Sequence, residues 1–448
     1  MTTSSSARTS LAAAGIEVIH AVREMPELEK SRDKRFAQAV ELLLSLTEVR
    51  WRGQYQAADR PDIDALAAEA EAAAWRCQSS ELVIRTKLLC GKTLLVTQGL
   101  VPSLGKLRTA VDLAKQHADH VSLFVARVEY GRQVSKRRLT DGLTQLQEAE
   151  HMYISDPRLR DSDDPVLRRT RNLGEMQLGI TLFDSGDLSE ALTRLRRCTE
   201  RLREDPLNVE LPIALNYLAQ VYEGLGLHDH AEAILWEALS FESARGGDSG
   251  WHAYNTALLA RLFAEQSAGY PRALELITDA WAETERTLLA NLIPLVRKLY
   301  AEILLLAPNR SEQLLKQAEQ LTVATCVETQ RNGMIRSKIA AHSLRGRIAL
   351  RQNDVTTAQE QTREAVRILE EVGDMPALRT EDVLYHAAVA MAAGDEQEEA
   401  LALLGKARRE IARKAELIAD SALRSSFLAQ VPLNRSILAG EGIGRWCS

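Results

Sequence analysis

Leu173 to Glu200 reads LGEMQLGITLFDSGDLSEALTRLRRCTE, and Ile213 to Leu239 reads IALNYLAQVYEGLGLHDHAEAILWEAL. In each stretch a small residue interrupts an apolar segment, a turn with glycine follows, and a second segment opens on alanine. Small residues are required where two helix backbones approach closely, and large apolar residues fill the space between neighbouring helix pairs. The two stretches therefore predict two successive helix–turn–helix units. Their equivalent residues are Gly179 and Ala219, Leu182 and Tyr222, Gly186 and Gly226, Ala191 and Ala231, and Cys198 and Ala238.

This spacing resembles the tetratricopeptide repeat, a helix–turn–helix unit of about 34 residues that stacks into a solenoid. Weaker copies of the pattern extend on both sides, around Gly91, Gly346 and Ala388. The composition agrees, because aromatic residues make up only 5% of the chain and the helix-favouring alanine, leucine, arginine and glutamate are abundant. We therefore expect an all-α fold, a right-handed α-solenoid of about nine tetratricopeptide-like helix pairs.

Breaks in the pattern predict how the chain is divided. The segment DPRLRDSDDP, from Asp156 to Pro165, interrupts the repeat with charge and proline, so we expect a loop whose acidic residues cap the following helix. The start of the chain is small and polar, which is typical of a disordered tail. The expected divisions are the disordered tail at 1–10, N-terminal helices at 11–45, a first block of repeats at 46–155, the loop at 156–165, a second block of repeats at 166–417, and a C-terminal capping helix and tail at 418–448.

The end of the array has its own signature. Ile418 to Leu438 reads IADSALRSSFLAQVPLNRSIL, with an arginine and a phenylalanine on one helix, then Val-Pro-x-Asn-Arg and a short apolar helix. This arrangement is similar to the end of the repeat sensor arrays in large bacterial regulators of the maltose-activator type. The resemblance implies that the tail covers the apolar face of the last repeat. Those regulators also carry a nucleotide-switch module and a DNA-binding helix-turn-helix, and neither signature occurs here.

Charge and composition restrict the class of protein. The net charge of −6 and a sequence pI near 6.0 argue against membrane-surface attraction and direct nucleic-acid binding. The five cysteines are scattered and the start lacks a secretory signal, which favours a reducing cytoplasm. The excess of arginine over lysine and the high alanine content suggest a bacterial, GC-rich genome. We expect a cytoplasmic protein without a membrane span.

Catalytic and cofactor signatures are missing from the sequence. Gly91-Lys92-Thr93 lacks the earlier glycine and the preceding strand of a phosphate-binding loop, so we expect a helix-packing role for Gly91. His117 with His120 has no third ligand at useful spacing, and surface histidines are the simpler interpretation. We predict no metal, no cofactor and no enzymatic activity.

Geometry supplies the functional argument. In tetratricopeptide arrays the first helices of successive pairs line a concave groove, and polar side chains there suit an extended ligand. An exposed concave face must also be polar whatever it binds, so solubility alone is the alternative explanation. The predicted binding residues are Arg50, Gln54, Arg85, Lys92, Arg127, Asn216, Gln220, Asn255, Arg347 and Arg351; Met176, Glu223, Lys298, Glu302, Ser343 and Tyr385 share the same face.

The charges of this face predict the kind of partner. Its N-terminal half carries Arg50, Arg85, Lys92 and Arg127 with no acidic residue at the matching groove positions. This excess of positive charge favours an acidic segment or a peptide with a free C-terminal carboxylate. A second basic stripe, which includes Arg194, Arg197 and Arg201, is interpreted as the solvated face of an amphipathic helix, with contact to an acidic partner protein or a nucleic-acid backbone as the alternative.

These observations lead to one functional expectation and one alternative. We expect a non-enzymatic scaffold or adaptor that holds a protein or peptide in its concave groove. The alternative is a sensor whose repeats bind a peptide or metabolite and control a partner transcription or signalling protein. Homo-oligomer formation is compatible with this sequence.

Overall fold

The computed structural model describes residues 39, 41–42, 60–204, 210–244, 250–266, 268–286, 292–308, 311–373 and 379–443. Within these ranges every regular element is a helix. The predicted tail at 1–10 and the groove residues Arg50 and Gln54 lie outside the described residues. The helices are α3 (Arg60–Arg76), α4 (Ser80–Thr97), α5 (Leu100–Gln116), α6 (His120–Val134), α7 (Leu139–Ser155), α8 (Pro157–Arg160), α9 (Pro165–Ser185), α10 (Leu188–Arg203), α11 (Leu211–Gly224), α12 (His228–Ala244), α13 (Gly250–Ala264), α14 (Tyr270–Arg286), α15 (Ile293–Leu305), α16 (Glu312–Asn332), α17 (Ile335–Arg351), α18 (Val355–Val372), α19 (Thr380–Ala393), α20 (Gln397–Leu417), α21 (Ser421–Ala429) and α22 (Pro432–Ala439).

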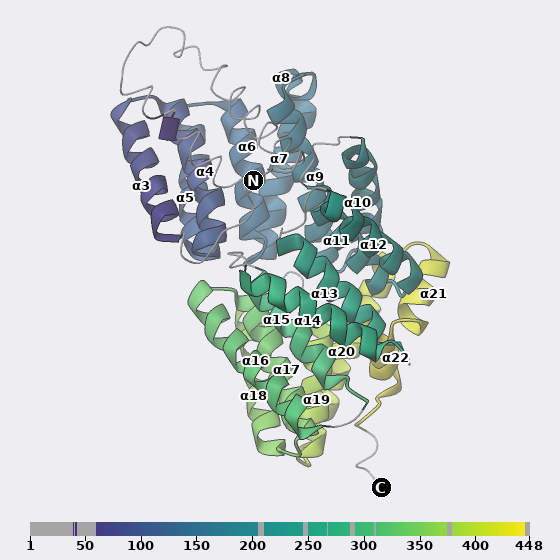
Figure 1. Cartoon of the computed structure of the whole chain (residues 1–448). Coiled ribbons are helices and arrows are strands. Elements are labelled where there is room, and N and C mark those ends of the chain that lie inside the picture. The colour runs from purple at the N-terminus through teal and green to yellow at the C-terminus, as the bar shows by residue number, and fades with distance from the viewer. Residues whose placement is uncertain are drawn as a thin grey trace.

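Neighbouring helices pack as antiparallel pairs that stack into a right-handed α-solenoid, as the sequence predicts (Figure 1). Eight complete pairs lie within the described residues, from α4–α5 to α19–α20, with α8 inserted between the second and third pair. The first helix of each pair contacts the first helix of the next, so these helices form the inner layer. Most of α13, for example, is buried, whereas α10 buries only its leucine-rich face.

Small residues lie at the predicted helix crossings. A Cβ atom added at Gly179 would approach Leu195 Cγ of the partner helix to 3.0 Å, and one added at Gly91 would approach Leu107 Cγ to 2.7 Å. Because these distances are at or below the limit for packed carbon atoms, only glycine lets the two helices approach this closely. The packing role predicted for Gly91 is therefore confirmed.

The interruption between the second and third pair is partly helical. Asp156 caps the one-turn helix α8 by accepting a hydrogen bond from the Arg158 amide, and Asp164 caps α9 in the same way from Val166. Each aspartate accepts a hydrogen bond from a backbone amide at the start of a helix, and a proline follows it at the first helical position. Both features favour a helix start, so this acidic, proline-containing segment leads directly into the long helix α9. Capping by this acidic run is confirmed, and α8 is an element that the sequence did not predict.

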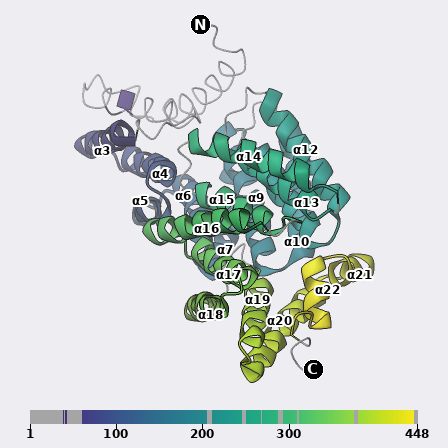
Figure 2. The same ribbon diagram turned by 60° about the horizontal axis from the view of Figure 1, so that its bottom comes forward.

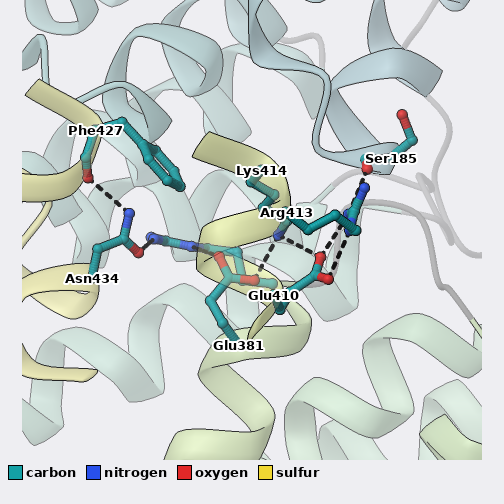
Figure 3. A network of polar contacts seen from close by, with 8 residues as sticks. Ser185, Glu381, Glu410, Arg413, Lys414, Phe427 and Asn434 are labelled. Carbon is teal, nitrogen blue, oxygen red and sulfur yellow. Dashed lines mark hydrogen bonds and ion pairs between the residues drawn. The ribbon is translucent and has the colours of Figure 1, made fainter. Parts of the chain in front are cut away.

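The two halves of the solenoid meet at two places, which we call the first and the second junction (Figures 1 and 2). At the first junction the α4–α5 turn touches the α16–α17 turn: a Cβ at Gly99 would lie 3.4 Å from Asn332 Cβ, and one at Gly333 would overlap Val101. At the second junction α20 touches the α9–α10 turn, where Arg413 Nη2 donates to the Ser185 carbonyl at 2.9 Å (Figure 3). Superhelical rotation thus brings early and late repeats together.

The last two helices fold back onto the final pair. Phe427, Val431 and Ile437 are buried in one hydrophobic cluster with Leu404 of α20. Asn434 Nδ2 donates to the Phe427 carbonyl at 2.9 Å and fixes α22 against α21 (Figure 3). The apolar surface of the last repeat is therefore covered by the chain itself.

Candidate functional site

The predicted positive charges of the N-terminal groove are neutralised by neighbouring side chains. Arg85 pairs with Glu81 at 2.7 Å on its own helix, and Lys92 pairs with the buried Glu129 of α6. Arg127 is directed at the second helix of its own pair, where its Nη1 donates to Gln145 at 3.1 Å and it also pairs with Glu148. For Arg85, Lys92 and Arg127 the expectation of uncompensated positive charge is therefore wrong, because acidic partners come from adjacent turns and helices.

The predicted amide residues form one buried chain of hydrogen bonds. Gln220 Nε2 donates to Asn216 Oδ1 at 2.7 Å, and Asn216 Nδ2 donates to Asn255 Oδ1 at 2.7 Å across the α11–α13 contact. Asn216 and Asn255 are fully buried, and Asn255 Nδ2 has no hydrogen-bond partner within the part of the chain that the structure describes. These amides hold two first helices together, and ligand binding by them stays a prediction.

The C-terminal half of the inner face is also cross-linked. Glu302 of α15 contacts Lys298 at 2.7 Å and Arg347 of α17 at 3.7 Å. Burial alone would raise the pKa of the Glu302 carboxyl, but Lys298 and Arg347 hold it below its usual value. Arg351, at the end of α17, is exposed and remains a predicted binding residue.

Three other members of the predicted face are not free to line a groove. Met176 is fully buried in the hydrophobic core, Ser343 is buried on α17, and the Tyr385 hydroxyl donates to the Glu441 carbonyl at 2.9 Å. Their inclusion in the groove is wrong, because helices from neighbouring pairs or the C-terminal tail cover these positions.

A distinct cavity of about 220 Å³ lies between the second and third pair, and we call it the inter-pair pocket. It is bounded by α6, α7, α9 and α10, next to the inserted helix α8. Its walls combine an apolar floor with a charged rim. The floor consists of Phe124, Val128, Leu146, Ala149, Gly174 and Leu178, and the remaining lining residues are Glu150, Tyr153, Ile154, Arg171, Glu175, Arg197 and Arg201.

Arginine is in excess at the rim of this pocket. Glu175 accepts from Arg197 Nε at 2.6 Å and also pairs with Arg201. Arg171 lies over the Tyr153 ring, 5.2 Å from its centre, and has no carboxylate partner among the described residues. Burial and the nearby Arg171 lower the pKa of the Arg201 guanidinium. A negatively charged group bound here would relieve this repulsion.

Glu150, on the same rim, is already paired with Arg194 at 2.7 Å. Arg194 and Arg201 are partly buried and bonded to acidic residues of α7 and α9, so the interpretation of the whole stripe as a solvated face is wrong. Only Arg197, with 57% of its side chain exposed, is largely solvated as that interpretation requires. The sequence shows the interrupted repeat and the basic stripe as two separate features. Tertiary packing decides that they lie side by side at one pocket.

The remaining chemistry is sparse in the described part of the chain. No group of three or more metal-ligating side chains occurs there, and none of its helices is long and apolar enough to cross a membrane. Burial raises the pKa of the Cys90 and Cys198 thiols to about 12, so both are protonated near neutral pH. Cys77 and Cys326 are partly buried and form no disulfide within the described residues, and Cys447 lies outside them.

No protein-family model and no curated protein matches this sequence. Solved structures do match its fold. A Rap protein complexed with competence and sporulation factor superposes with a TM-score of 0.52 at 11% identity, covering 81% of this chain and 99% of that chain. A human IFIT1 dimer with m7Gppp-AAAA has a TM-score of 0.42 at 14% identity, covering 98% and 93%.

A signal transduction ATPase with a tetratricopeptide repeat sensor from Pyrococcus horikoshii has a TM-score of 0.41 at 12% identity. The match covers 97% of this chain and 62% of that one. At such identities the likeness concerns the fold alone, and the predicted tetratricopeptide-type solenoid is confirmed. The narrower resemblance to maltose-activator-type regulators stays a prediction.

Proposed function

We propose that this protein is a non-enzymatic adaptor that anchors a partner peptide or protein in the inter-pair pocket. The observation that carries the proposal is the combination of an apolar floor with an arginine-rich rim in one cavity. The anchor is a large apolar residue that stands beside a carboxylate, either its own C-terminal carboxylate or that of an adjacent acidic residue. The scaffold would act in the bacterial cytoplasm.

The size of the pocket favours an anchor residue over a free metabolite. Its volume of about 220 Å³ is below the roughly 300–1,000 Å³ typical of sites that enclose a drug-sized ligand. A single buried aromatic or aliphatic side chain is the usual energetic centre of a protein interface. The adaptor is therefore preferred to the metabolite sensor at this site.

The charge of the rim favours a carboxylate beside that side chain. Arg171 stacks on Tyr153 and pairs with no carboxylate of the described residues, so its guanidinium donors can bond an incoming oxyanion. Glu175 is occupied by Arg197 and Arg201 and does not cancel this charge. Hydrogen bonds to charged groups contribute about 1.5–3 kcal/mol each, which is about tenfold or more in affinity.

The test is selection from a displayed peptide library with free C-termini, followed by fluorescence anisotropy on the selected sequences. We expect enrichment of large apolar residues at or next to a carboxylate, and weaker binding after C-terminal amidation where the carboxylate is terminal. Arg171→Glu should weaken binding about tenfold or more because it replaces attraction with repulsion. Gly174→Leu should abolish binding, since a Cβ there already lies 3.3 Å from Val128 Cγ2 and a longer side chain fills the pocket.

The matched control is Arg196→Glu, on the exposed side of α10 and outside the pocket lining. It makes the same charge change and should leave affinity unchanged. Binding that is unaffected by both pocket variants contradicts the proposed site. If the same peptides are then lost with Gln220→Ala or Arg351→Ala, the inner face binds the partner, as first expected from the sequence.

A second candidate function is the sensor, and the two junctions are the observation that favours it. Contacts between repeats that are far apart in sequence give the solenoid a closed shape that a ligand can stabilise or open. A change in the radius of gyration on binding, measured by small-angle X-ray scattering, would support this alternative. An unchanged radius supports the rigid adaptor.

A further inference from the structure

The first junction encloses a small cavity of about 40 Å³ that we call the junction cavity. Six helices and the α6–α7 turn contribute to it, from the first pair through to the seventh. Its volume suits one polar group and exceeds the roughly 10–15 Å³ needed for a single water. The lining residues are Leu95, Leu100, Lys136, Tyr217, Trp251, Leu292, Leu295, Met334, Arg336 and Ser337.

Two cationic side chains line this cavity without carboxylate partners. Lys136 Nζ donates to the Gln133 carboxamide at 2.7 Å and makes no ion pair among the described residues. Arg336, at the start of α17, makes no hydrogen bond or ion pair with any described residue. Two such cations lie together here, whereas Lys92 and Arg347 of the inner face have acidic partners. Two unpaired cations in a partly buried position are costly unless an anion joins them.

Three helix starts converge on the same cavity. The starts of α5, α15 and α17 all contribute lining residues, and none of the three has a side-chain cap. Each therefore brings the positive end of its dipole near the cavity. These features favour a negative charge but are not by themselves a site.

Two buried polar side chains at the first junction give evidence for a ligand that does not depend on the helix starts. Ser337 is 4% exposed, lines the cavity, and its hydroxyl has no hydrogen-bond partner among the described residues. Asn332, which is 7% exposed and lies against Gly99 at the same junction, has an unpartnered Nδ2. A buried hydroxyl or amide of this kind gains a hydrogen bond when an ion or a ligand enters beside it.

We infer that the junction cavity is a binding site for a single oxyanion group, a phosphate or a carboxylate, which locks the first junction closed. Lys136 and Arg336 neutralise its charge, and the Ser337 hydroxyl donates a hydrogen bond to it. The bound group bridges the second pair, through Lys136, and the seventh pair, through Arg336 and Ser337, and so stabilises the closed superhelix. This site is separate from the inter-pair pocket, and the inference does not rest on the proposed adaptor function.

The protonation of Lys136 adds a pH dependence. Burial, then Arg132 and Arg336, lower the pKa of the Lys136 ammonium to about 7, while Glu129 and Asp184 oppose that shift. An anion binds the charged lysine better, so affinity should fall as pH rises above 7 by up to about tenfold per pH unit, the limit for one linked proton. The tyrosines Tyr217 and Tyr254, which face the same region, have raised pKa values through burial and stay neutral in this range.

Isothermal titration calorimetry of the full chain with sulfate, inorganic phosphate and acetate tests the inference. Sulfate keeps a constant charge and serves for the pH series, while acetate tests the carboxylate source. We expect binding of at least one of them at pH 6, weaker binding of sulfate at pH 8.5, and a higher Tm than in sodium chloride of equal ionic strength. No binding by any of the three anions overturns the inference.

Variants of the lining residues test whether the anion binds in the junction cavity. Arg336→Gln and Lys136→Met should each weaken binding about tenfold or more, and the pH dependence should vanish in Lys136→Met. The control Arg331→Gln removes an exposed arginine of the same junction that does not line the cavity, and it should bind as the wild type does. If Arg336→Gln does not fold, Ser337→Ala removes only the unpartnered hydroxyl and should still weaken binding severalfold. Equal affinity in the folded variants and the control overturns the assignment.

Discussion

The two junctions connect the same halves of the solenoid but differ in how their polar groups are satisfied. At the second junction Lys414 Nζ contacts Glu381 at 2.6 Å and Glu410 at 3.5 Å, and Arg413 bonds both Glu410 and the Ser185 carbonyl (Figure 3). At the first junction, in contrast, the hydroxyl of Ser337 and the charges of Lys136 and Arg336 lack such partners among the residues that the structure describes. A completed network makes a junction structural, whereas an incomplete one is suited to a ligand.

The second junction should therefore be the more sensitive to removal of a single charge. Lys414→Met leaves the carboxyl of Glu381, a residue only 1% exposed, without its buried ammonium, and breaking such a pair costs about 3–5 kcal/mol. Urea denaturation monitored by circular dichroism measures this loss. The double variant Lys414→Met with Glu381→Gln should recover part of it, because the buried charge is gone. A loss below about 1 kcal/mol would mean that Lys414 is not a structural charge.

A glycine at each junction gives a second comparison. Gly186 has φ of +88° and Gly333 has φ of +64°, a conformation that costs other residues about 1–2 kcal/mol. A Cβ at Gly186 would lie 2.8 Å from the Lys414 stem, which its ion pair holds in place, whereas a Cβ at Gly333 meets the exposed Val101, which can rotate. We expect Gly186→Ala to destabilise by about 2–3 kcal/mol and Gly333→Ala by about 1–2. Equal losses would remove the distinction between the junctions.

The two junctions should also differ in how they make the free energy of unfolding depend on pH, and this can be measured without changing a side chain. The folded-state pKa of Lys136, about 7, is below that of an unfolded lysine, so above pH 7 the unfolded chain binds more protons and stability rises with pH. The gain is at most about 1.4 kcal/mol per pH unit up to pH 9. Glu381, whose pKa is lowered against the effect of burial chiefly by Lys414, is ionised in both states there and adds no slope.

Denaturation curves at pH 7, 8 and 9, for the wild type and Lys136→Met, test this difference in low-anion buffer. The variant should lack the contribution of the junction cavity. Identical slopes in the two proteins would show that Lys136 is not the titrating group.

The smallest effect is expected at the inter-pair pocket, where Arg171 has only an aromatic contact. Arg171→Gln should change the free energy of unfolding by no more than about 1 kcal/mol, the value of a cation–π contact with Tyr153. Thermal denaturation beside Arg196→Gln measures it. A much larger loss of unfolding free energy would show that Arg171 holds the fold together, as Lys414 does, and is not available to a partner.

The sequence by itself determined the local architecture. Gly179, Ala219 and their equivalents predict the helix pairs because close backbone contacts exclude larger side chains. Asp164 predicts a helix start because its carboxylate caps amides two residues further on. Such signals act within one helix pair, where periodicity and capping are readable in order along the chain.

Only the tertiary structure decided which polar residues are available. Lys92 is neutralised by Glu129 of the next pair, and Gly333 meets Val101 from the first pair, more than 200 positions earlier in the chain. These contacts follow from small rotations that accumulate from repeat to repeat, and the sequence pattern fixes no single rotation. The inter-pair pocket and the junction cavity are products of that accumulated geometry, which is why residue spacing alone predicted a groove and not these two sites.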